Sequence, residues 1–431
     1  MADVDLEKIV SLCKRRGFVF PNSEIYGGIQ GFYDYGPLGT LMKNNIKNIW
    51  RKWMAEHDNV YEIDGDIITH PRVWEASGHI QNFKEPLVEC KSCHKRFSME
   101  KLEEQGIHKC PECEGKLTEP KNFSILVEAQ VGVVEGDKKT VYLRGEACQT
   151  IYLDYENVLQ SMHLKFPFGI CQIGKAFRNE ITSKQFLFRL REFEQWDLQW
   201  FTKPEEMEKW FEYWKEGRMD FYKNLINKKD KIRFYQHPAD KLAFYAKKAF
   251  DIQYEAPWGW SEWEGIHWRS DYDLTQHGKF AGKDFTYTDP ETGEKYLPNI
   301  VETSGGVDRT FLYLLFDAYQ EEENRIVLQL NPRIAPYQLA VFPLLKNKPE
   351  LVAKAKEIYA SLRQNFSTAY DERGNIGKRY YAQDEIGTPW CLTVDFQSLQ
   401  DGTVTIRDRD SMKQERVALD KVIEYIDKGL H

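Results

Sequence analysis

The stretches that decide the fold read Phe177-Arg178-Asn179-Glu180, then Arg189-x-x-x-Phe193, and much later Ser304-Gly305-Gly306-Val307-Asp308-Arg309. The first two predict antiparallel strands joined by a polar loop from Ile181 to Gln185. The third predicts a glycine turn that runs directly into a helix from Thr310 to Tyr319. A planar guanidinium both stacks on a base and binds phosphate oxygens in pairs. The pattern therefore suits a bent ATP beside an activated carboxylic acid, with one guanidinium on the α-phosphate and a second above the adenine.

Length and composition indicate a multidomain globular protein. The 431 residues are 42% hydrophobic and 14% aromatic, which favours two or three well-packed domains. No apolar run approaches the roughly 18 residues that cross a bilayer, and Met1-Ala2-Asp3-Val4-Asp5 lacks the features of a signal peptide. We therefore expect a cytoplasmic protein with no membrane partner. The net charge of −8 leaves room only for a local nucleic-acid patch.

Four of the eight cysteines form two Cys-x-x-Cys pairs, Cys90/Cys93 and Cys110/Cys113. This spacing is typical of a tetrahedral zinc ribbon. Four thiolates leave no open position for water or substrate, so we expect a structural Zn²⁺. The alternatives are a chance pair of dicysteines and substitution of a ligand by His94 or His108. The predicted module, about residues 86–120, interrupts the main domain as an insertion.

The order of predicted elements indicates an α+β domain followed by a smaller α/β domain. Antiparallel strands with helices inserted between them dominate residues 1–330. The predicted strands are 60–63, 122–130, 140–143, 168–173, 186–193 and 197–201, and the predicted helices are 5–17, 39–57 and 149–164. A helical insertion is predicted at about 203–255, with helices at 203–226 and 238–250. Helix 39–57 and strand 60–63 could form a dimer edge.

The pattern of predicted helices and strands changes near Asn331-Pro332, where we expect a domain boundary. Residues 331–431 alternate between strands and helices, which predicts a small three-layer α/β domain. The strands are expected at 339–342, 368–370, 390–394 and 403–406, and the helices at 348–365, 376–385 and 414–427. A strand at 326–330 precedes the boundary. The glycine-rich segment Gly27–Pro37 is not predicted to be a phosphate loop, because no Gly-Lys-Ser/Thr follows it.

Because these motifs occur together and in this order, the chain resembles glycyl-tRNA synthetases of the homodimeric class II type, essentially from end to end. The segment ending at Pro71 and the two arginine signatures look like the three motifs of the class. Four further stretches look specific to the glycine enzymes. They are Trp74–His79, Leu143–Glu146, Arg191–Gln195 and Gly402–Arg409. The tail is similar to the anticodon-binding domain of the glycyl, prolyl, threonyl and histidyl enzymes.

The resemblance implies two steps, with tRNA(Gly) and glycine as partners. Glycine's carboxylate attacks the α-phosphorus of ATP and displaces Mg²⁺-bound pyrophosphate, and the adenylate then acylates the terminal adenosine of tRNA. Positioning and charge stabilisation carry the rate. The implied catalytic residues are Arg178, Glu180 and Arg309, with Arg178 on the α-phosphate, Glu180 on the adenine amino group and Arg309 over the ring. The implied ATP contacts also include Asn179, Phe188, Arg189, Arg191, Phe193, Glu262, Trp263, Arg269, Gly306 and Asp308.

Glycine selection is implied to rest on carboxylates that grip the ammonium group and leave no volume for a β-carbon. The residues implied for this pocket are Arg96, Glu146, Phe193, Asp197, Glu302, Ser304 and Gly306. Asp197 departs from the family, which usually has Glu there. A shorter carboxylate reaches less far, so either a water fills the gap or the backbone lies closer.

Two other functions compete with this interpretation. A non-catalytic, nucleic-acid-binding relative of the synthetases would be expected to lose Arg178, Glu180 and Arg309, and all three are present. A threonyl-type enzyme would use an open zinc site with mixed His and Cys ligands, which four paired cysteines argue against. In the last domain, basic residues including Lys378, Arg379, Arg407, Arg409 and Lys413 are expected on a solvated face or in contact with RNA.

Overall fold

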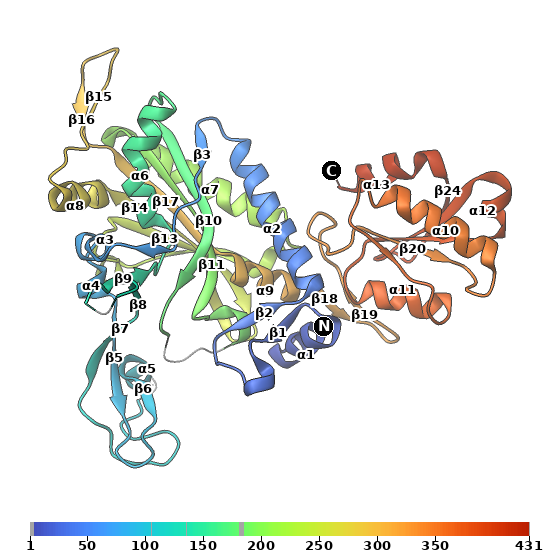
Figure 1. Cartoon of the computed structure of the whole chain (residues 1–431), viewed down its shortest axis with the longest axis horizontal. Coiled ribbons are helices and arrows are strands. Elements are labelled where there is room, and N and C mark those ends of the chain that lie inside the picture. The colour runs from blue at the N-terminus through green and yellow to red at the C-terminus, as the bar shows by residue number, and fades with distance from the viewer. Residues whose placement is uncertain (1–3, 105, 135, 181–184, 431) are drawn as a thin grey trace.

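A computed structural model describes residues 4–104, 106–134, 136–180 and 185–430. The chain forms a large N-terminal part around a long sheet and a separate C-terminal domain beside it (Figure 1). The loop predicted at Ile181–Gln185 lies outside the described residues, apart from Gln185.

The large part is built on a seven-stranded sheet in the order β12-β13-β14-β17-β11-β10-β3. All pairs are antiparallel except β10 with β3. The strands are β3 (Val60–Glu62), β10 (Phe168–Phe177), β11 (Glu192–Thr202), β12 (Ile232–Gln236), β13 (Lys248–Ala256), β14 (Gly259–Ser270) and β17 (Asn299–Gly306). The α+β class with an antiparallel sheet is therefore confirmed.

Strand β11 shows why the two faces of this sheet differ. Successive side chains of a strand point to opposite faces. Trp196, Leu198 and Trp200 belong to the main core, which also contains residues of α2 (Pro37–Ala55), α7 (Met207–Lys223) and α9 (Val307–Ala318). The polar residues that alternate with them, Gln195, Asp197 and Gln199, face the other side. There α6 (Cys148–Ser161) and α8 (Tyr272–Ala281) cover only part of the sheet. This uncovered polar face forms the floor of the main cavity.

Smaller elements surround the sheet. Helix α1 (Leu6–Arg16) is capped by the Asp5 side chain and ends at Gly17, whose φ of 75° suits glycine. The others are β1 (Val19–Pro21), β2 (Tyr33–Tyr35), β4 (Ile68–Thr69), α3 (Pro71–Ala76), α4 (His79–Asn82), β15 (Tyr287–Thr288), β16 (Lys295–Tyr296), β18 (Tyr319–Glu321) and β19 (Ile326–Leu328). Short 3₁₀ turns lie at Glu24–Tyr26, Phe186–Phe188, Pro204–Glu206, Lys229–Lys231, Ala239–Lys241 and Leu419–Lys421.

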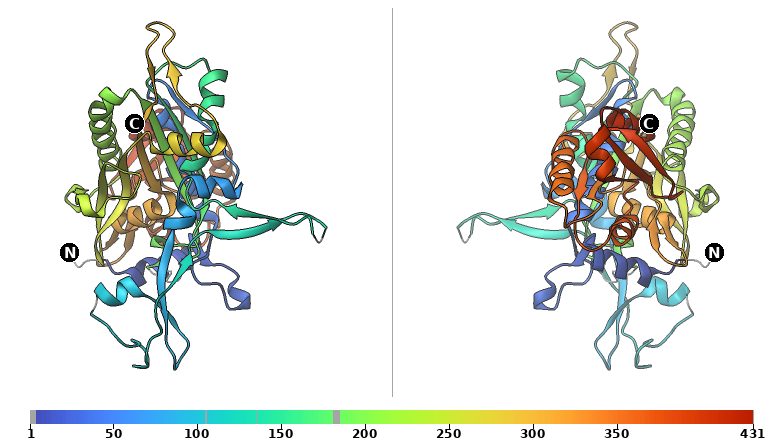
Figure 2. Two further views of the ribbon diagram at one scale, coloured as in Figure 1. Left: turned by 90° about the vertical axis from the view of Figure 1, so that its left-hand side faces the viewer. Right: turned by 90° about the vertical axis from the view of Figure 1, so that its right-hand side faces the viewer.

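Two extensions leave the body of the large part, as Figure 2 shows. One carries the cysteine pairs and contains β5 (Lys84–Glu89), β6 (Arg96–Ser98), α5 (Met99–Glu104) and β7 (Lys121–Ser124). The other is the hairpin of β8 (Val127–Val131) and β9 (Lys139–Leu143), which pairs with β4 at its base.

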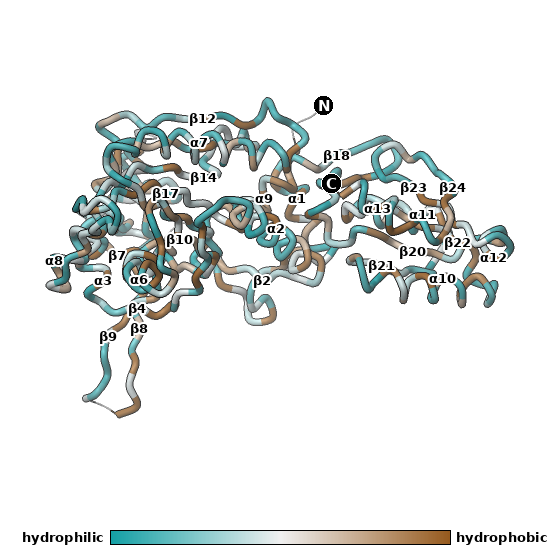
Figure 3. The backbone as a smooth tube through the Cα atoms, turned by 90° about the horizontal axis from the view of Figure 1, so that it is seen from above, coloured by the Kyte–Doolittle hydropathy of each residue, from teal (hydrophilic) through white to brown (hydrophobic). Residues whose placement is uncertain are grey.

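The C-terminal domain has a five-stranded sheet in the order β21-β20-β22-β23-β24. Val341 packs with Ile358 of α10 and Ile426 of α13 in one cluster, whereas its neighbour Phe342 packs with Tyr380 of α11 in another. The domain therefore has three layers. The sheet is the middle layer, and the apolar residues of β20 are buried within it (Figure 3). Its elements are β20 (Leu339–Pro343), α10 (Pro349–Leu362), β21 (Thr368–Tyr370), α11 (Ile376–Asp384), β22 (Trp390–Val394), α12 (Phe396–Asp401), β23 (Thr403–Asp408), β24 (Gln414–Ala418) and α13 (Val422–Leu430).

The structure corrects three sequence predictions. Of residues 186–193, predicted as a strand, Phe186–Phe188 form a 3₁₀ turn that follows the positive φ of Gln185 and Phe186, and β11 begins only at Glu192. The helix predicted at 238–250 is absent among these described residues, and β12 and β13 instead extend the central sheet. The predicted helical insertion 203–255 is therefore helical only in its first part, where α7 confirms the helix predicted at 203–226. Residues 414–418 form β24, and the last helix begins only at Val422. In the last two cases pairing with a neighbouring strand overrides local helix preference.

Candidate active site

A cavity of about 340 Å³ opens on the polar face of the central sheet. Residues from β11, β14, β17, the start of α9 and the turn after β10 meet there. Twelve of the predicted site residues line it: Glu146, Arg178, Glu180, Phe188, Arg189, Phe193, Glu262, Glu302, Ser304, Gly306, Asp308 and Arg309. The structure therefore brings together most of the residues that the three motifs predicted.

Two arginines of the cavity are held by aromatic rings and backbone carbonyls. The guanidinium carbon of Arg178 lies 5.4 Å from the ring centre of Phe193, and its Nε donates to Gly145 O at 3.0 Å. Arg309 lies 4.6 Å from the ring centre of Phe188. Among the described residues, Arg178 has no carboxylate at ion-pair distance, which leaves its remaining N–H groups for a ligand.

Glu180 is fixed at the end of the first arginine motif. Arg191 Nε donates to the Glu180 carbonyl at 2.7 Å, while the Glu180 carboxylate lies 3.6 Å from Arg189 Nε. The Arg189 side chain is 40% exposed and this pair is long. Arg191 is therefore used inside the protein, whereas Arg189 is a cation that faces the cavity.

Asp308 is a buried anchor at the first turn of α9. Its carboxylate accepts from Tyr35 OH at 2.5 Å, from Lys43 Nζ at 2.7 Å and from the Glu194 amide at 2.6 Å. These bonds tie α9 to β2, α2 and β11. The indole of Trp196 packs against the backbone just before α9. Only glycine fits at position 305, because a Cβ there would lie 2.5 Å from Trp196 Nε1. The Gly-Gly-Val-Asp motif thus sets the position of Arg309.

Glu302 is a buried carboxylate held by Arg269 and His267. It lies in β17, accepts from Arg269 Nη1 at 2.9 Å, and contacts His267 Nδ1 at 2.7 Å. Burial works to raise its pKa, but Arg269 and His267 outweigh burial and lower the pKa to about 2. The same contact with Glu302 raises the pKa of His267 against the effect of its burial.

Glu146 lies two residues before α6 and also lines the cavity. It contacts His79 Nε2 at 3.1 Å and accepts from Cys148 Sγ at 2.9 Å and Gln149 Nε2 at 3.0 Å. Burial works to raise its pKa, but His79 more than offsets burial, so the pKa lies well below the usual value. Glu146 is therefore an anion in a largely dry setting.

Asp197 lies beneath the cavity and does not line it. Gln199 Nε2 donates both to Asp197 Oδ1 and, at 2.9 Å, to Glu302 Oε1. Asp197 Oδ2 has no partner among the described residues. Burial and the nearby Glu302 raise the pKa of Asp197 well above its usual value. Glu302 and Asp197 are thus shifted in opposite directions, so Glu302 carries the negative charge of the pair.

Other predicted site residues lie outside the main cavity. Trp263 occupies a β-bulge of β14, so its indole points into the core, where Nε1 donates to Thr310 Oγ1 at 2.9 Å. Arg269 is buried and bonded to both Asp273 and Glu302. Arg96, Asn179 and Arg191 line a separate cavity of about 280 Å³ beside the cysteine module. The predicted ligand contact of the Trp263 side chain is corrected to a core position.

Several residues of the cavity were missed by sequence reasoning. They include Gln195, Tyr245, His267 and the pair His237 and Asp251, which contact each other at 2.9 Å. His267 lies directly opposite Glu302 in the pairing of β14 with β17, and this register is set only in the folded sheet. Tyr245 lies in the stretch predicted as a helix, and no local signal placed it in the site.

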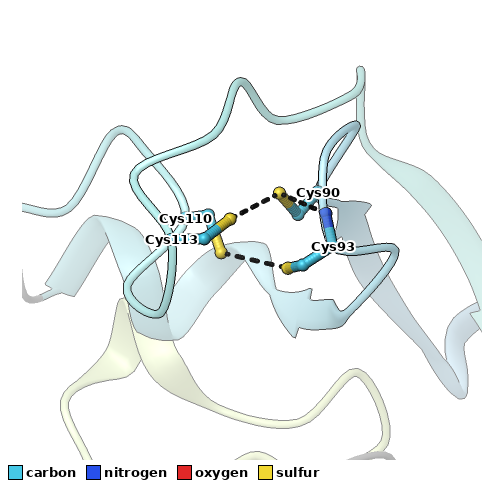
Figure 4. A group of neighbouring side chains, drawn as sticks. All are labelled: Cys90, Cys93, Cys110 and Cys113. Atoms are coloured by element: carbon cyan, nitrogen blue, oxygen red, sulfur yellow. Dashed lines mark hydrogen bonds between the residues drawn. The ribbon is translucent and has the colours of Figure 1, made fainter.

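The four cysteines form one cluster in the inserted module (Figure 4). Cys90 Sγ lies 3.4 Å from Cys113 Sγ, and Cys93 Sγ lies 3.6 Å from Cys110 Sγ. Sulfurs of a tetrahedral zinc site are separated by about 3.8 Å, given Zn–S bonds near 2.3 Å. His94 instead contacts Glu89 at 3.3 Å and is exposed. The donor set fits zinc, and four sulfurs fill its coordination shell.

Three basic residues expected on a solvated face of the last domain are buried instead. Arg379, Arg407 and Arg409 are 2%, 4% and 3% exposed. Arg407 forms two bonds with Asp384, and Arg409 Nη1 donates to the Gly387 carbonyl at 2.8 Å. Their role is therefore inside the protein, and the prediction of a solvated face is wrong for them.

Comparison with known families adds an independent finding. Residues 132–319 match the family described as tRNA synthetase class II core domain (G, H, P, S and T), and residues 338–429 match the anticodon binding domain. Among the described residues, no helix combines the length and apolarity needed to cross a membrane.

Curated relatives match nearly the whole chain. A glycine–tRNA ligase of Treponema denticola is 49% identical over 98% of this chain and 96% of its own length. One of Borreliella burgdorferi is 48% identical over 98% and 97%. One of Thermobifida fusca is 45% identical over 99% and 98%.

Proposed function

Because the chain belongs to the glycine–tRNA ligase family of class II synthetases, we propose that it activates glycine with ATP and transfers the glycyl group to the 3′ end of tRNA(Gly). The observation that carries this proposal is the cavity itself. It joins Arg178, which has no carboxylate at ion-pair distance among the described residues, to the buried carboxylates Glu146 and Glu302.

The first chemical step needs charge stabilisation and no protein nucleophile. A carboxylate oxygen of glycine attacks the α-phosphorus, and pyrophosphate leaves with the bonding electrons. Arg178 bridges the α-phosphate and the glycine carboxylate, because its guanidinium is charged, lines the cavity and has no competing carboxylate among the described residues. A donor aimed at developing charge contributes about 10²–10³-fold in rate.

The glycine subsite lies among Glu146, Glu302 and Ser304. Two buried carboxylates attract the ammonium group, and Gln195 Nε2 fixes Ser304 by a bond of 2.5 Å to its Oγ. Rejection of alanine must come from lack of space, since binding discriminates one methyl by only about 1–3 kcal/mol. Asp197 acts one layer below, through Gln199, rather than on the substrate.

The ATP subsite uses the aromatic and cationic lining. Phe193 and Phe188 are the rings available for stacking, Arg309 covers the adenine, and Glu180 accepts from its amino group. Arg189 is better suited to the terminal phosphates than Arg269, because Arg269 is already bonded to Asp273 and Glu302. Among the lining carboxylates, the half-exposed Glu262 offers the hard oxygen ligand that Mg²⁺ prefers.

The cysteine module binds one structural Zn²⁺ through Cys90, Cys93, Cys110 and Cys113. The metal would stabilise the module, which has few apolar contacts of its own, and take no part in the reaction. A metal analysis of the purified protein should give one zinc per chain, and Cys93→Ser with Cys110→Ser should abolish it.

The decisive experiment is exchange of labelled pyrophosphate into ATP with glycine, alanine, serine, threonine and proline side by side. Exchange with glycine alone is expected. Exchange with another amino acid would contradict the glycine pocket, and no exchange with any of them would favour a non-catalytic nucleic-acid-binding protein on the same scaffold. We further propose a cytoplasmic homodimer; a stable monomer in light scattering at micromolar concentration would contradict the dimer.

A further inference from the structure

The junction between the two parts of the chain is closed by a small cluster of buried charges. Asp384 and Glu385 end helix α11 of the C-terminal domain and are 0% and 7% exposed. A helix C-terminus carries partial negative charge, so carboxylates are unfavourable there. Buried carboxylates in this position require cationic partners.

Both carboxylates take partners from the N-terminal part. Arg325, in the turn between β18 and β19, donates to Asp384 Oδ2 at 2.8 Å and to the Arg409 carbonyl at 2.9 Å. Glu385 is bound by Arg15 and Arg16 at the end of α1. Two consecutive residues of α11 therefore contact two separate elements of the catalytic part.

The C-terminal domain also supplies its own counterion. Arg407 donates to both oxygens of Asp384, at 2.8 and 2.9 Å. Arg325 is likewise bonded to Glu322 beside it, at 2.7 and 2.9 Å. The bond between Arg325 and Asp384 thus links two pairs that are each complete without it. Neither domain requires this link for its own stability. The link therefore acts on the position of one domain relative to the other.

We propose that Arg325, Asp384 and Glu385 are positioning residues that fix the anticodon-binding domain relative to the active site, so that one tRNA engages both. This inference rests on the proposed function. Two sites on one ligand reinforce each other only when their spacing matches the ligand, and a loosened junction lowers the effective concentration of the second site. Adenylate formation involves no tRNA and should not depend on the junction.

The test uses the full-length double variant Arg325→Met with Glu385→Gln. In this variant Asp384 keeps Arg407, and Glu322 faces solvent. We expect kcat/KM for aminoacylation of tRNA(Gly) to fall on the order of tenfold, mainly through KM, while glycine-dependent pyrophosphate exchange is unchanged. Small-angle X-ray scattering of the free protein should show a larger radius of gyration. Arg373→Gln with Asp371→Asn, which replaces an exposed arginine of the same domain and the carboxylate paired with it, is the charge-matched control.

Unchanged aminoacylation together with an unchanged scattering curve would overturn the proposal. An equal loss in pyrophosphate exchange and aminoacylation would also overturn it, because that result indicates general damage to the fold. If the unmodified protein fails to charge tRNA(Gly), the proposed function fails, and the scattering comparison still tests whether the cluster fixes the two domains.

Discussion

Arg178 of the active-site cavity and Arg407 of the C-terminal domain come from equally distinctive stretches of sequence, yet they have opposite surroundings. Arg178 stacks on aromatic rings and bonds to a backbone carbonyl. Arg407 is buried against both oxygens of Asp384. A guanidinium whose charge is already balanced has little to offer a phosphate. The comparison teaches that partner chemistry, more than motif membership, separates arginines that bind ligand from arginines that hold the fold.

The largest effect should come from removing Arg407, the counterion of Asp384 within the C-terminal domain. Arg407→Met leaves Asp384 buried with a single bond to Arg325, and losing one partner of a buried pair costs about 3–5 kcal/mol. We expect chemical denaturation to show this loss in the free energy of unfolding of the C-terminal domain, with glycine-dependent exchange retained. If Arg407→Met lost pyrophosphate exchange but kept its free energy of unfolding, the distinction between arginines that bind ligand and arginines that hold the fold would be wrong.

The converse result is expected in the cavity. Arg178→Ala should lower the rate of glycine-dependent pyrophosphate exchange about 10²–10³-fold, because a preorganised cation at the developing charge is lost. The variant should unfold at nearly the same denaturant concentration as the unmodified protein, since no ion pair is broken. Arg373→Gln should match the unmodified protein in both measurements. An Arg178 variant with full activity would remove the central element of the proposed mechanism.

A smaller effect on stability is expected when a buried carboxylate, Glu302, is compared with an exposed one. The pKa of Glu302 is lowered from 4.5 to about 2, so its pairing with Arg269 and His267 contributes about 3 kcal/mol of stability. This contribution is complete above about pH 4.5 and disappears as the pH falls towards 2. We expect Glu302→Gln to be less stable than the unmodified protein at pH 6, and the difference to shrink on acidification.

The control for this series is Glu291→Gln, which alters an exposed pair with Lys165. Exposed pairs contribute roughly 0–1 kcal/mol, so its unfolding curve should follow that of the unmodified protein at every pH. A difference between Glu302→Gln and the unmodified protein that stays constant from pH 6 to pH 2.5 would show that Glu302 is not ionised in the folded state.

Helix predictions succeeded where a segment carries its own period. The apolar residues of α2 recur at Met42, Ile46 and Trp50, and this spacing places them on one buried face. The prediction failed at 238–250, which holds the 3₁₀ turn Ala239–Lys241, a loop and the first residues of β13, because β12 and β14 offer β13 backbone partners on both sides. Strand pairing joins residues far apart in sequence, so no local window contains the reason for it.

The active site was predicted unevenly for the same reason. Arg178, Phe193 and Arg309 were found because their motifs are contiguous stretches, and the structure places all three on one cavity. His267 and Tyr245 have no such motif. Trp263 was assigned to the site, together with Glu262, from the family resemblance, but a single extra residue in the strand turns its side chain into the core.

The sequence by itself determined the class of the sheet, the family resemblance, the grouping of four cysteines and most of the residues that line the cavity, because each of these can be recognised from a short stretch of sequence. Only the tertiary structure decided which charges are free. Arg178 is available, while Arg269, Arg407 and Arg409 are bonded within the protein. The physical reason is that the effect of a charge depends on its counterions and its burial, and both are set by residues that meet only when the chain folds.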